Sequence, residues 1–282
     1  MTIVILICSE QSTRGRHNAA LQGSEQILFS DKNQAWTGSI MDYLQLEEWI
    51  EASPRTVFFG GAGVSTESGI PDFRSENGIF KALEKYGRSP ETLLSRTFFH
   101  FRPEIFFEYY RENLLVTDVQ PNPAHFGLAR LESEGRLSAV ITQNVDGLHQ
   151  KAGSKNVLEL HGSIYRNYCM ICGKKYGIET ILQSEGIPRC GCGGIIRPDV
   201  VLYEENLPEG VFEKAIEEVS SASLLIIGGT SLAVYPAAGL LQYFRGDHLV
   251  LINRSETPYD SMADLVIREP IGEVFSALDV CK

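Results

Sequence analysis

The chain has 282 residues, of which 43% are hydrophobic, and a formal net charge of -11. This apolar content is enough for one large domain or two smaller ones, and the acidic balance disfavours nucleic acid as a partner because phosphate binding needs a positive field. No apolar run approaches the roughly 20 residues of a membrane-spanning helix. Six cysteines are too few for a disulfide framework in so long a chain, so we expect reduced thiols and a cytoplasmic protein.

Residues 1–40 differ from the rest of the chain. After a short apolar run at residues 3–8 they are polar and unpatterned, a composition that predicts a poorly ordered extension. They lack the basic start, apolar core and cleavage site of a signal peptide. A patterned helix is predicted at residues 41–50, and we expect Met41 to be the true start; a regulatory tail is the alternative.

A glycine-rich turn follows the first predicted strand, at residues 57–59. Residues 60–69 read GGAGVSTESG and lead into a predicted helix. Glycine lets the backbone approach a phosphate closely, and a helix N-terminus offers free N–H groups. Thr66 stands where the dehydrogenase fingerprint needs a third glycine, so hydride transfer is poorly supported. A tight connection without a ligand is the alternative for this turn, and the IPDFRS loop at residues 70–75 is equally read as a ligand cover or an ordinary turn.

Residues 79–115 are helical in pattern and rich in aromatic side chains. Aromatic clusters are more often core than site, so we predict a helical insertion with an aromatic core. Pro121 and Pro123 then break the chain before a predicted helix at residues 124–134, whose His125 we expect to be structural.

Polar side chains follow the next predicted strand, at residues 137–141. The sequence reads QNVDGLH at residues 143–149 and ELHGS at residues 159–163. An amide, a carboxylate and histidines thus gather where the strand ends. Ligands bind at the carboxyl edge of open α/β sheets, so this edge is the candidate site.

Two pairs of cysteines have the spacing of metal ligands. Cys169 and Cys172 precede Cys190 and Cys192 by a short polar stretch, although the second pair has one intervening residue where two are commoner. Four thiolates suit tetrahedral zinc and leave no open position for water. We therefore predict one structural Zn²⁺ per chain; four free cysteines are the less favoured alternative.

The last third alternates strands and helices. Strands are predicted at residues 196–202, 224–227, 248–252 and 264–267, with helices at 211–219 and 235–243 and a terminal helix. Strands separated by helices imply a parallel, doubly wound sheet. The turns at Gly229 and Asn253 would meet the first glycine-rich turn at one edge.

These motifs together resemble the sirtuins, a family of NAD-consuming protein deacylases, and in particular a bacterial-type member. The resemblance covers residue 42 to the C-terminus. It rests on GAGVSTESGIPDFR at 61–74, TQNVDGLHQKAG at 142–153, ELHGS at 159–163, the two cysteine pairs, RPDVVLYEE at 197–205, GTSLAVYPAAGL at 229–240 and the Asn253 turn.

The resemblance implies an α/β fold with a large Rossmann-like NAD-binding domain and a small domain. The large domain would comprise residues 41–76, 117–165 and 197–282. The small domain would combine the helical module at 77–116 with a zinc ribbon at 166–196, and both substrates would bind between the domains.

The resemblance also implies the reaction: NAD and an acetyl-lysine protein or peptide give free lysine, nicotinamide and O-acetyl-ADP-ribose. His161 would be the general base, while Asn144 and Asp146 would hold the nicotinamide ribose and amide. Val200 and Val201 would present the edge to which the peptide adds as a strand. The remaining cofactor-binding residues would be Gly61, Ala62, Gly63, Ser65, Asp72, Phe73, Arg74, Gln143, Gly229, Thr230, Ser231, Asn253, Arg254, Ser255 and Ile271.

Sirtuins that prefer acidic acyl groups carry a tyrosine and, three residues on, an arginine in the helical module. Those positions are Tyr110 and Asn113 in this sequence, and Arg111 lies on another helical face. We therefore expect a preference for acetyl and longer apolar groups. Two other activities are considered: mono-ADP-ribosylation of proteins, which would not need His161, and a non-catalytic dinucleotide sensor, which would have lost these residues.

Overall fold

The computed structural model describes residues 31–72 and 76–280. The chain forms two compact units, residues 1–37 and 38–282. Helix α1 (Asp31–Ala52) contains the predicted helix at 41–50 but begins earlier. Residues 31–40, which we predicted to be poorly ordered, are helical, and they contain no proline that would interrupt the helix. The rest of the predicted extension, residues 1–30, lies outside the described residues.

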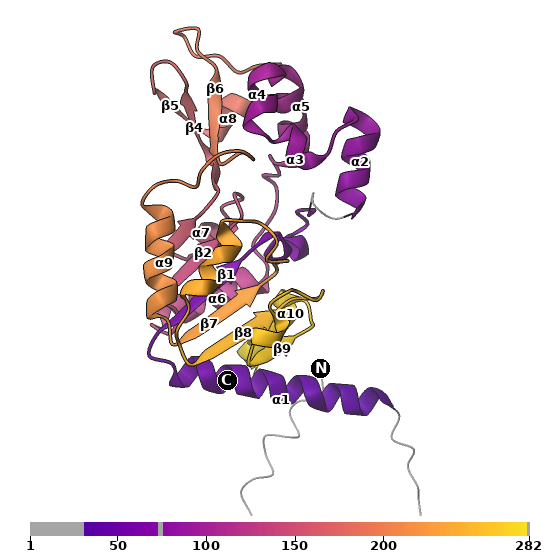
Figure 1. The fold of residues 1–282 in the computed structure, drawn as a ribbon, viewed down its shortest axis with the longest axis vertical. Coiled ribbons are helices and arrows are strands. Elements are labelled where there is room, and N and C mark those ends of the chain that lie inside the picture. Colours follow the sequence, from indigo (N-terminus) through magenta and orange to yellow (C-terminus); the bar gives the residue numbers. More distant parts are fainter. Residues whose placement is uncertain (1–30, 73–75, 281–282) are drawn as a thin grey trace, which may run out of the picture. The chain divides into compact units, whose positions relative to one another are not determined.

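A six-stranded parallel sheet forms the centre of the second unit (Figure 1). From β1 the chain adds β2 and then β3 on one side; later it returns beside β1 with β7 and adds β8 and β9 on the other side. This confirms the doubly wound sheet. The strands are β1 (Thr56–Gly60), β2 (Ala139–Thr142), β3 (Val157–Glu159), β7 (Leu224–Gly228), β8 (His248–Ile252) and β9 (Leu265–Ile267).

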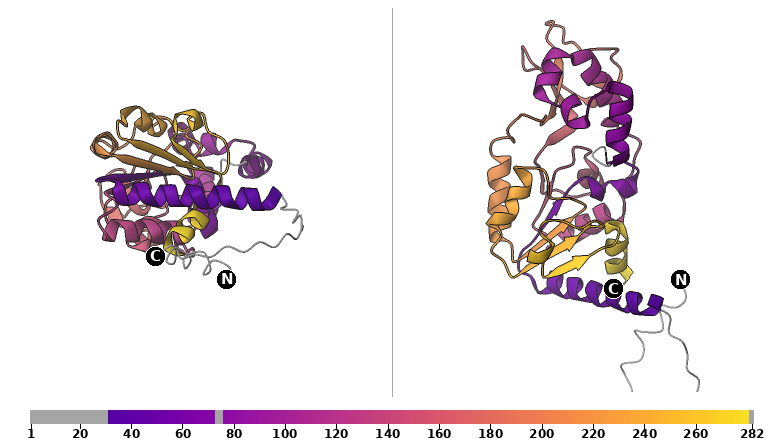
Figure 2. Two further views of the ribbon diagram at one scale, coloured as in Figure 1. Left: turned by 90° about the horizontal axis from the view of Figure 1, so that it is seen from below. Right: turned by 45° about the vertical axis from the view of Figure 1, so that its right-hand side comes forward.

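Helices cover both faces of this sheet because successive strand residues point to opposite sides. Phe58 packs with α6 (Pro123–Ser133) and α10 (Ile271–Val280). Its neighbours Val57 and Phe59 pack on the other face, with α9 (Val211–Ser221) and the 3-10 helix η4 (Ala237–Tyr243). Figure 2 shows the ribbon from two further sides.

A second, three-stranded antiparallel sheet has the order β5-β4-β6. Its core is shared with the predicted helical module: Phe99 and Phe106 pack with Ile164 and Ile196. The predicted aromatic core is confirmed, with Phe80 and Phe101 as exposed exceptions, while the domain boundaries stay a prediction. The elements are α2 (Glu76–Tyr86), α3 (Pro90–Leu93), α4 (Arg96–Phe101), α5 (Pro103–Asn113), β4 (Gly162–Cys169), β5 (Lys175–Tyr176), α8 (Ile178–Leu182) and β6 (Ile196–Val200).

Short helices complete the described chain: η2 (Ala62–Val64), η3 (Thr66–Ser68), α7 (Leu148–Ala152) and η5 (Asp260–Met262). Within residues 31–72 and 76–280, no helix combines the length and apolar character that crossing a membrane requires.

Candidate active site

The two glycine-rich turns meet where the strand order reverses, between β1 and β7. Gly61 N–H donates to Gly228 O at 3.2 Å, and Gly63 N–H donates to Gly229 O at 2.8 Å. A Cβ added to Gly63 would lie 2.7 Å from Gly229 Cα, so a larger residue would separate the turns. A reversal point of this kind is where open α/β sheets bind ligands.

The first turn differs from our prediction. It does not lead directly into an α-helix but forms η2 and η3, and α2 begins only at Glu76. Gly69 has a φ of 90°, in the left-handed region, and ends η3, and Pro71 disfavours a helical conformation at Ile70 before it. The turn therefore leads into short 3-10 helices and not directly into the predicted helix N-terminus, and the N–H groups of Gly61, Gly63 and Ser65 already donate to main-chain carbonyls.

Ser65 links Asn144 and Asp146 beside this turn. The Asn144 side-chain amide donates to Ser65 Oγ and to Gly61 O, both at 3.0 Å. Ser65 Oγ in turn donates to Asp146 Oδ2 at 2.7 Å, and Asp146 Oδ1 accepts from Leu148 N–H at 2.9 Å. The loop after β2 is thus fastened to the loop after β1, which fixes two predicted site residues in one arrangement.

Asp146 is a buried carboxyl group. Burial raises its pKa above the ordinary value, against the opposing effect of the hydrogen bonds from Leu148 and Ser65. A perturbed carboxyl group in a cavity is a common mark of a functional site.

His161 is oriented by the main chain. Its Nδ1 lies 2.9 Å from Gln143 O, and because a carbonyl oxygen only accepts, Nδ1 carries the hydrogen in this bond. Nε2 of a neutral ring is then the atom able to accept a proton. The Gln143 side chain donates to Thr230 Oγ1 at 3.2 Å, and its buried Oε1 has no hydrogen-bond partner among the described residues.

One cavity of about 210 Å³ brings the predicted groups together. Asn144 and Asp146 line it from the loop after β2, His161 from the turn between β3 and β4, and Val200 and Val201 from the end of β6. The other predicted residues on its wall are Ala62, Ser65 and Gln143.

The predicted peptide edge is partly occupied by the protein's own hydrogen bonds. Val201 N–H donates to His161 O at 2.9 Å, and Val200 O accepts from Arg197 at 3.2 Å. A peptide strand at this edge would therefore have to bond main-chain groups other than Val201 N–H and Val200 O.

The predicted adenosine side lies at the ends of β7 and β8. Thr230 is buried, and Ser231 is exposed beside it. Asn253 donates from its side chain to Ser255 O at 2.8 Å, which shapes the turn that also contains the exposed Arg254. Ile271 is buried in the core at the start of α10. Asp72 is half-buried, while Phe73 and Arg74 lie outside the described residues.

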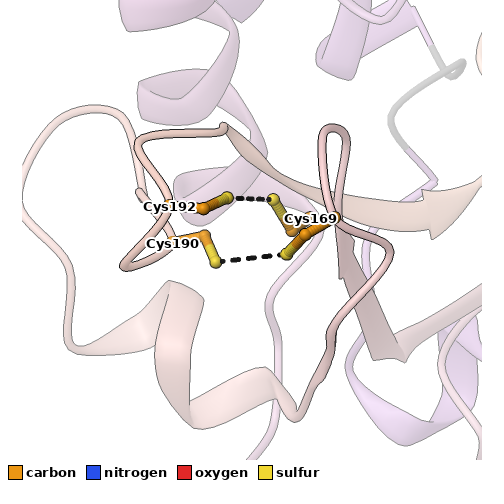
Figure 3. A group of neighbouring side chains, drawn as sticks. Cys169, Cys190 and Cys192 are labelled. Atoms are coloured by element: carbon orange, nitrogen blue, oxygen red, sulfur yellow. Dashed lines mark hydrogen bonds between the residues drawn. The ribbon is translucent and has the colours of Figure 1, made fainter.

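The four predicted metal ligands form a compact cluster in the small sheet (Figure 3). Their sulfur atoms all lie within 4.8 Å of one another, with Cys169 Sγ 3.4 Å from Cys192 Sγ and Cys172 Sγ 3.6 Å from Cys190 Sγ. Tetrahedral zinc with Zn–S bonds of about 2.3 Å places sulfurs about 3.8 Å apart. The cluster therefore fits a zinc ion, and none of these cysteines lines the cavity.

Sequence reasoning missed two contributions to the site. Asn122 caps α6 and donates to Val64 O at 2.7 Å, so it connects the first glycine-rich turn to the start of α6. Tyr235 and Pro236 line the cavity as well. The asparagine between two prolines is a helix-start signal, whereas our prediction used these prolines only as a chain break. Tyr235 and Pro236 lie in the motif at residues 229–240, and the prediction gave these two residues no role.

Comparisons with known proteins agree with this geometry. The model of the Sir2 family matches residues 61–236. An NAD-dependent protein deacetylase of Clostridium acetobutylicum is 56% identical over 83% of this chain and 96% of its own length, and one of Clostridium perfringens is 58% identical over 82% and 95%. A solved structure described as Sir2 with p53 peptide and NAD+ has a TM-score of 0.75 and 40% identity, covering 83% of this chain and 95% of its own. The chain therefore belongs to the Sir2 family.

Proposed function

We propose that this protein is an NAD-dependent protein-lysine deacetylase that releases nicotinamide and O-acetyl-ADP-ribose. The observation that carries the proposal is the arrangement of Asn144, Asp146 and His161 around one cavity, with Ser65 bonded to the first two. Similar proteins support it: the clostridial relatives are named NAD-dependent protein deacetylases, and a similar Sir2 structure holds a deacetylated p53 peptide and 3'-O-acetyl-ADP-ribose.

The residues around the strand-order reversal suit the dinucleotide. The contact between Gly63 and Gly229 leaves bare backbone at the edge, and the unpartnered Oε1 of Gln143 is an acceptor suited to a ribose hydroxyl. When bound, the dinucleotide supplies the ribose carbon that receives the acyl oxygen and releases nicotinamide. We assign the pyrophosphate side to Gly61, Ala62, Gly63 and Ser65, the covering loop to Asp72, Phe73 and Arg74, and the adenosine side to Gly229, Thr230, Ser231, Asn253, Arg254, Ser255 and, at its margin, Ile271.

Each catalytic side chain has a separate task in this proposal. Asn144 and Asp146 orient the nicotinamide ribose and its amide, so that the weakly nucleophilic acyl oxygen is held within about 3–3.5 Å of the carbon it attacks. His161 Nε2 accepts a proton from a ribose hydroxyl, whose oxygen then attacks the acyl carbon. General-base catalysis of this kind contributes typically about 10²–10⁴-fold.

We assign the peptide to the edge of β6, at Val200 and Val201. Main-chain pairing reads the shape of a peptide more than its side chains, so sequence preference should be loose. Tyr235 and Pro236 line the same cavity.

The cavity favours acetyl over acidic acyl groups. Its described lining contains Asp146, Glu204 and Glu205 but no lysine or arginine. Asn113 donates its side-chain amide to Tyr109 O at 2.9 Å, and Arg111 turns away to Ile181 O and Ser184 Oγ. A succinyl carboxylate would therefore find no lysine or arginine among the described lining residues, and we expect deacetylation to exceed desuccinylation when kcat/KM is compared on one peptide sequence. The reverse order would contradict this.

The test of the proposed function is one incubation with an acetyl-lysine peptide and NAD, in which nicotinamide and peptide products are followed together by mass spectrometry. Deacetylation requires equal amounts of nicotinamide and free-lysine peptide. Nicotinamide release with ADP-ribose attached to protein would indicate ADP-ribosyl transfer, and neither product would indicate a non-catalytic dinucleotide sensor.

We also propose that the protein works in the cytoplasm with zinc in a purely structural role. The proposal is supported by the four thiols held as a ligand set, which a reducing compartment preserves.

A further inference from the structure

Arg166 joins the two sheets of the protein. Its Nη1 lies 2.6 Å from Glu159 Oε2, and its Nε lies 2.9 Å from Asp199 Oδ2. Glu159 ends β3 at the edge of the six-stranded sheet, whereas Arg166 and Asp199 belong to β4 and β6 of the three-stranded sheet. One guanidinium therefore binds a carboxylate from each sheet.

An irregularity in the pairing of β4 with β6 accompanies this contact. Ser163 pairs with Asp199, but regular pairing resumes only between Asn167 and Pro198. The residues between, including Arg166, have no regular partner on β6. Bulges of this kind redirect side chains out of the normal alternation, and here the redirected side chain meets both carboxylates.

Glu159 is itself held in place, which makes it a firm anchor. Its side chain is only 11% exposed, and its second oxygen accepts from Gln150 on α7 at 2.9 Å. Arginine suits such a pair of acceptors because its planar fork presents several donors at once.

Glu159 and Arg166, which form one of these ion pairs, lie on either side of His161 along the chain. A main-chain bond also joins the sheets there: Ile164 N–H on β4 donates to Val145 O in the loop after β2 at 3.0 Å. Val201 N–H donates to His161 O at 2.9 Å, which extends the pairing of β4 with β6 to the residue that connects the sheets. The placement of the cavity wall at Val200 and Val201 against Asn144 and Asp146 thus depends on this junction.

We propose that Arg166 is a positioning residue that sets the three-stranded sheet, and with it the peptide wall of the cavity, against the six-stranded sheet. The described residues that we assign to the dinucleotide lie on the strands, loops and helices of the six-stranded sheet, so Arg166 should act on the peptide and not on the dinucleotide. This inference rests on the proposed deacetylase function for its kinetic test, but not for its structural one.

The kinetic test compares Arg166→Gln with the native protein. We expect KM for the acetyl-lysine peptide to rise about three- to tenfold, the range for losing two partly exposed ion pairs, while Kd for NAD measured by calorimetry stays unchanged. Arg166→Lys should recover part of the loss, because an ammonium group does not reproduce the fork. Added salt should raise the peptide KM of the native protein more than that of Arg166→Gln, because salt screens exposed charges.

The matched control is Arg136→Gln, which also removes an arginine that bridges two carboxylates, Glu51 at 3.3 Å and Glu134 at 3.6 Å, but away from the cavity. It should leave the peptide KM unchanged. An unchanged peptide KM in Arg166→Gln, or an equal weakening of NAD binding, would overturn the proposal.

The structural test is hydrogen exchange at the amides of Ile164 and Val201, followed by mass spectrometry. Arg166→Gln should exchange faster at both, and unchanged exchange would overturn the proposal even if the protein proved not to deacetylate. If the native protein shows no NAD-dependent deacetylation, the proposed function is wrong, whatever the result of the hydrogen-exchange test.

Discussion

The imidazole of His161 is held at Nδ1 by Gln143 O, which leaves Nε2 for proton transfer. The chemistry of the site depends on this tautomer, since the same ring with its hydrogen on Nε2 could not accept a proton there. Asn144 and Asp146 are fixed independently of it, through Ser65. The proton-transfer task and the binding task are thus carried by separate contacts.

We predict that His161→Ala reduces deacetylation by at least about 10²-fold, the lower end of general-base contributions, while NAD binding stays largely intact. Product mass measures the first and calorimetry the second. His100→Ala is the control, because His100 is exposed on α4 and does not line the cavity. Near-normal turnover in His161→Ala would show that His161 is not the general base.

The sequence identified Asn144 and Asp146 because they follow a predicted apolar strand, and His161 because it lies in a recognisable motif. It did not reveal that Ser65 bonds Asp146, since the two residues are 81 positions apart and only the pairing of β1 with β2 brings them together. Arg166 was missed for a similar reason. Its two partners lie on different sheets, and no local pattern marks them.

Helices α6 and α7 pack through two buried histidines. The rings of His125 and His149 lie 4.7 Å apart between centroids, and neither nitrogen of His149 has a protein partner. Burial lowers the pKa of His125 to about 4 and that of His149 to about 3. Both stay neutral in the fold under conditions in which the unfolded chain protonates them.

The free energy of unfolding should therefore fall as pH decreases below about 6.5, where the unfolded chain takes up protons that the fold refuses, by up to about 1.4 kcal/mol per pH unit for each histidine. The contribution of each histidine is fully present above its unfolded pKa. We predict that the free energy of unfolding of His149→Phe depends less steeply on pH. Urea unfolding between about pH 4 and 7, the range that these pKa shifts cover, measures this dependence. The exposed His100→Phe should keep the native slope; an unchanged slope in His149→Phe would refute the assignment.

The zinc ribbon should be structural. We predict one zinc per chain, measured by elemental mass spectrometry, and retained deacetylation after replacement of zinc by cobalt, since four sulfur ligands leave no position for a substrate. Cys169→Ser should lose both the metal and thermal stability because Cys169 is buried in the shared core. Cys281→Ser, outside the four-thiol set, is the control. Activity that tracked the identity of the metal would contradict a structural role.

Element prediction succeeded for strands with continuous apolar runs, such as β7 and β8, because such runs occur where both faces are covered. Strand β3 was not predicted; it is three residues long and ends in a glutamate. The helix predicted at residues 235–243 is the 3-10 helix η4, which starts at Ala237, after Pro236. Apolar spacing alone does not distinguish so short a helix from an α-helix.

On the scale of the whole molecule, Leu46 and Ile50 are the part of α1 that enters the core of the large sheet. We predict that protein made from Met41 keeps its thermal stability and deacetylase activity. Protein made from Ser53 should lose stability, because these two side chains bury fully and leave a cavity when removed. Thermal unfolding measures the stability of both shortened proteins, and the peptide assay measures their deacetylase activity. A large loss of either in protein made from Met41 would support the alternative of a regulatory tail.

The pairing of β1 with β7 has a consequence for how the chain folds. Strand β1 ends at Gly60, and its partner begins at Leu224, so during synthesis from the N-terminus one edge of β1 stays without its native neighbour until most of the protein has been made. The shared core of the small sheet and the helical module likewise draws on residues from Ala82 to Leu202. Contacts of such long sequence separation slow folding and prolong the exposure of open strand edges. Protection of the nascent chain, by a chaperone or by early pairing of β1 with β2, should therefore matter more for the yield of this protein than its final stability does.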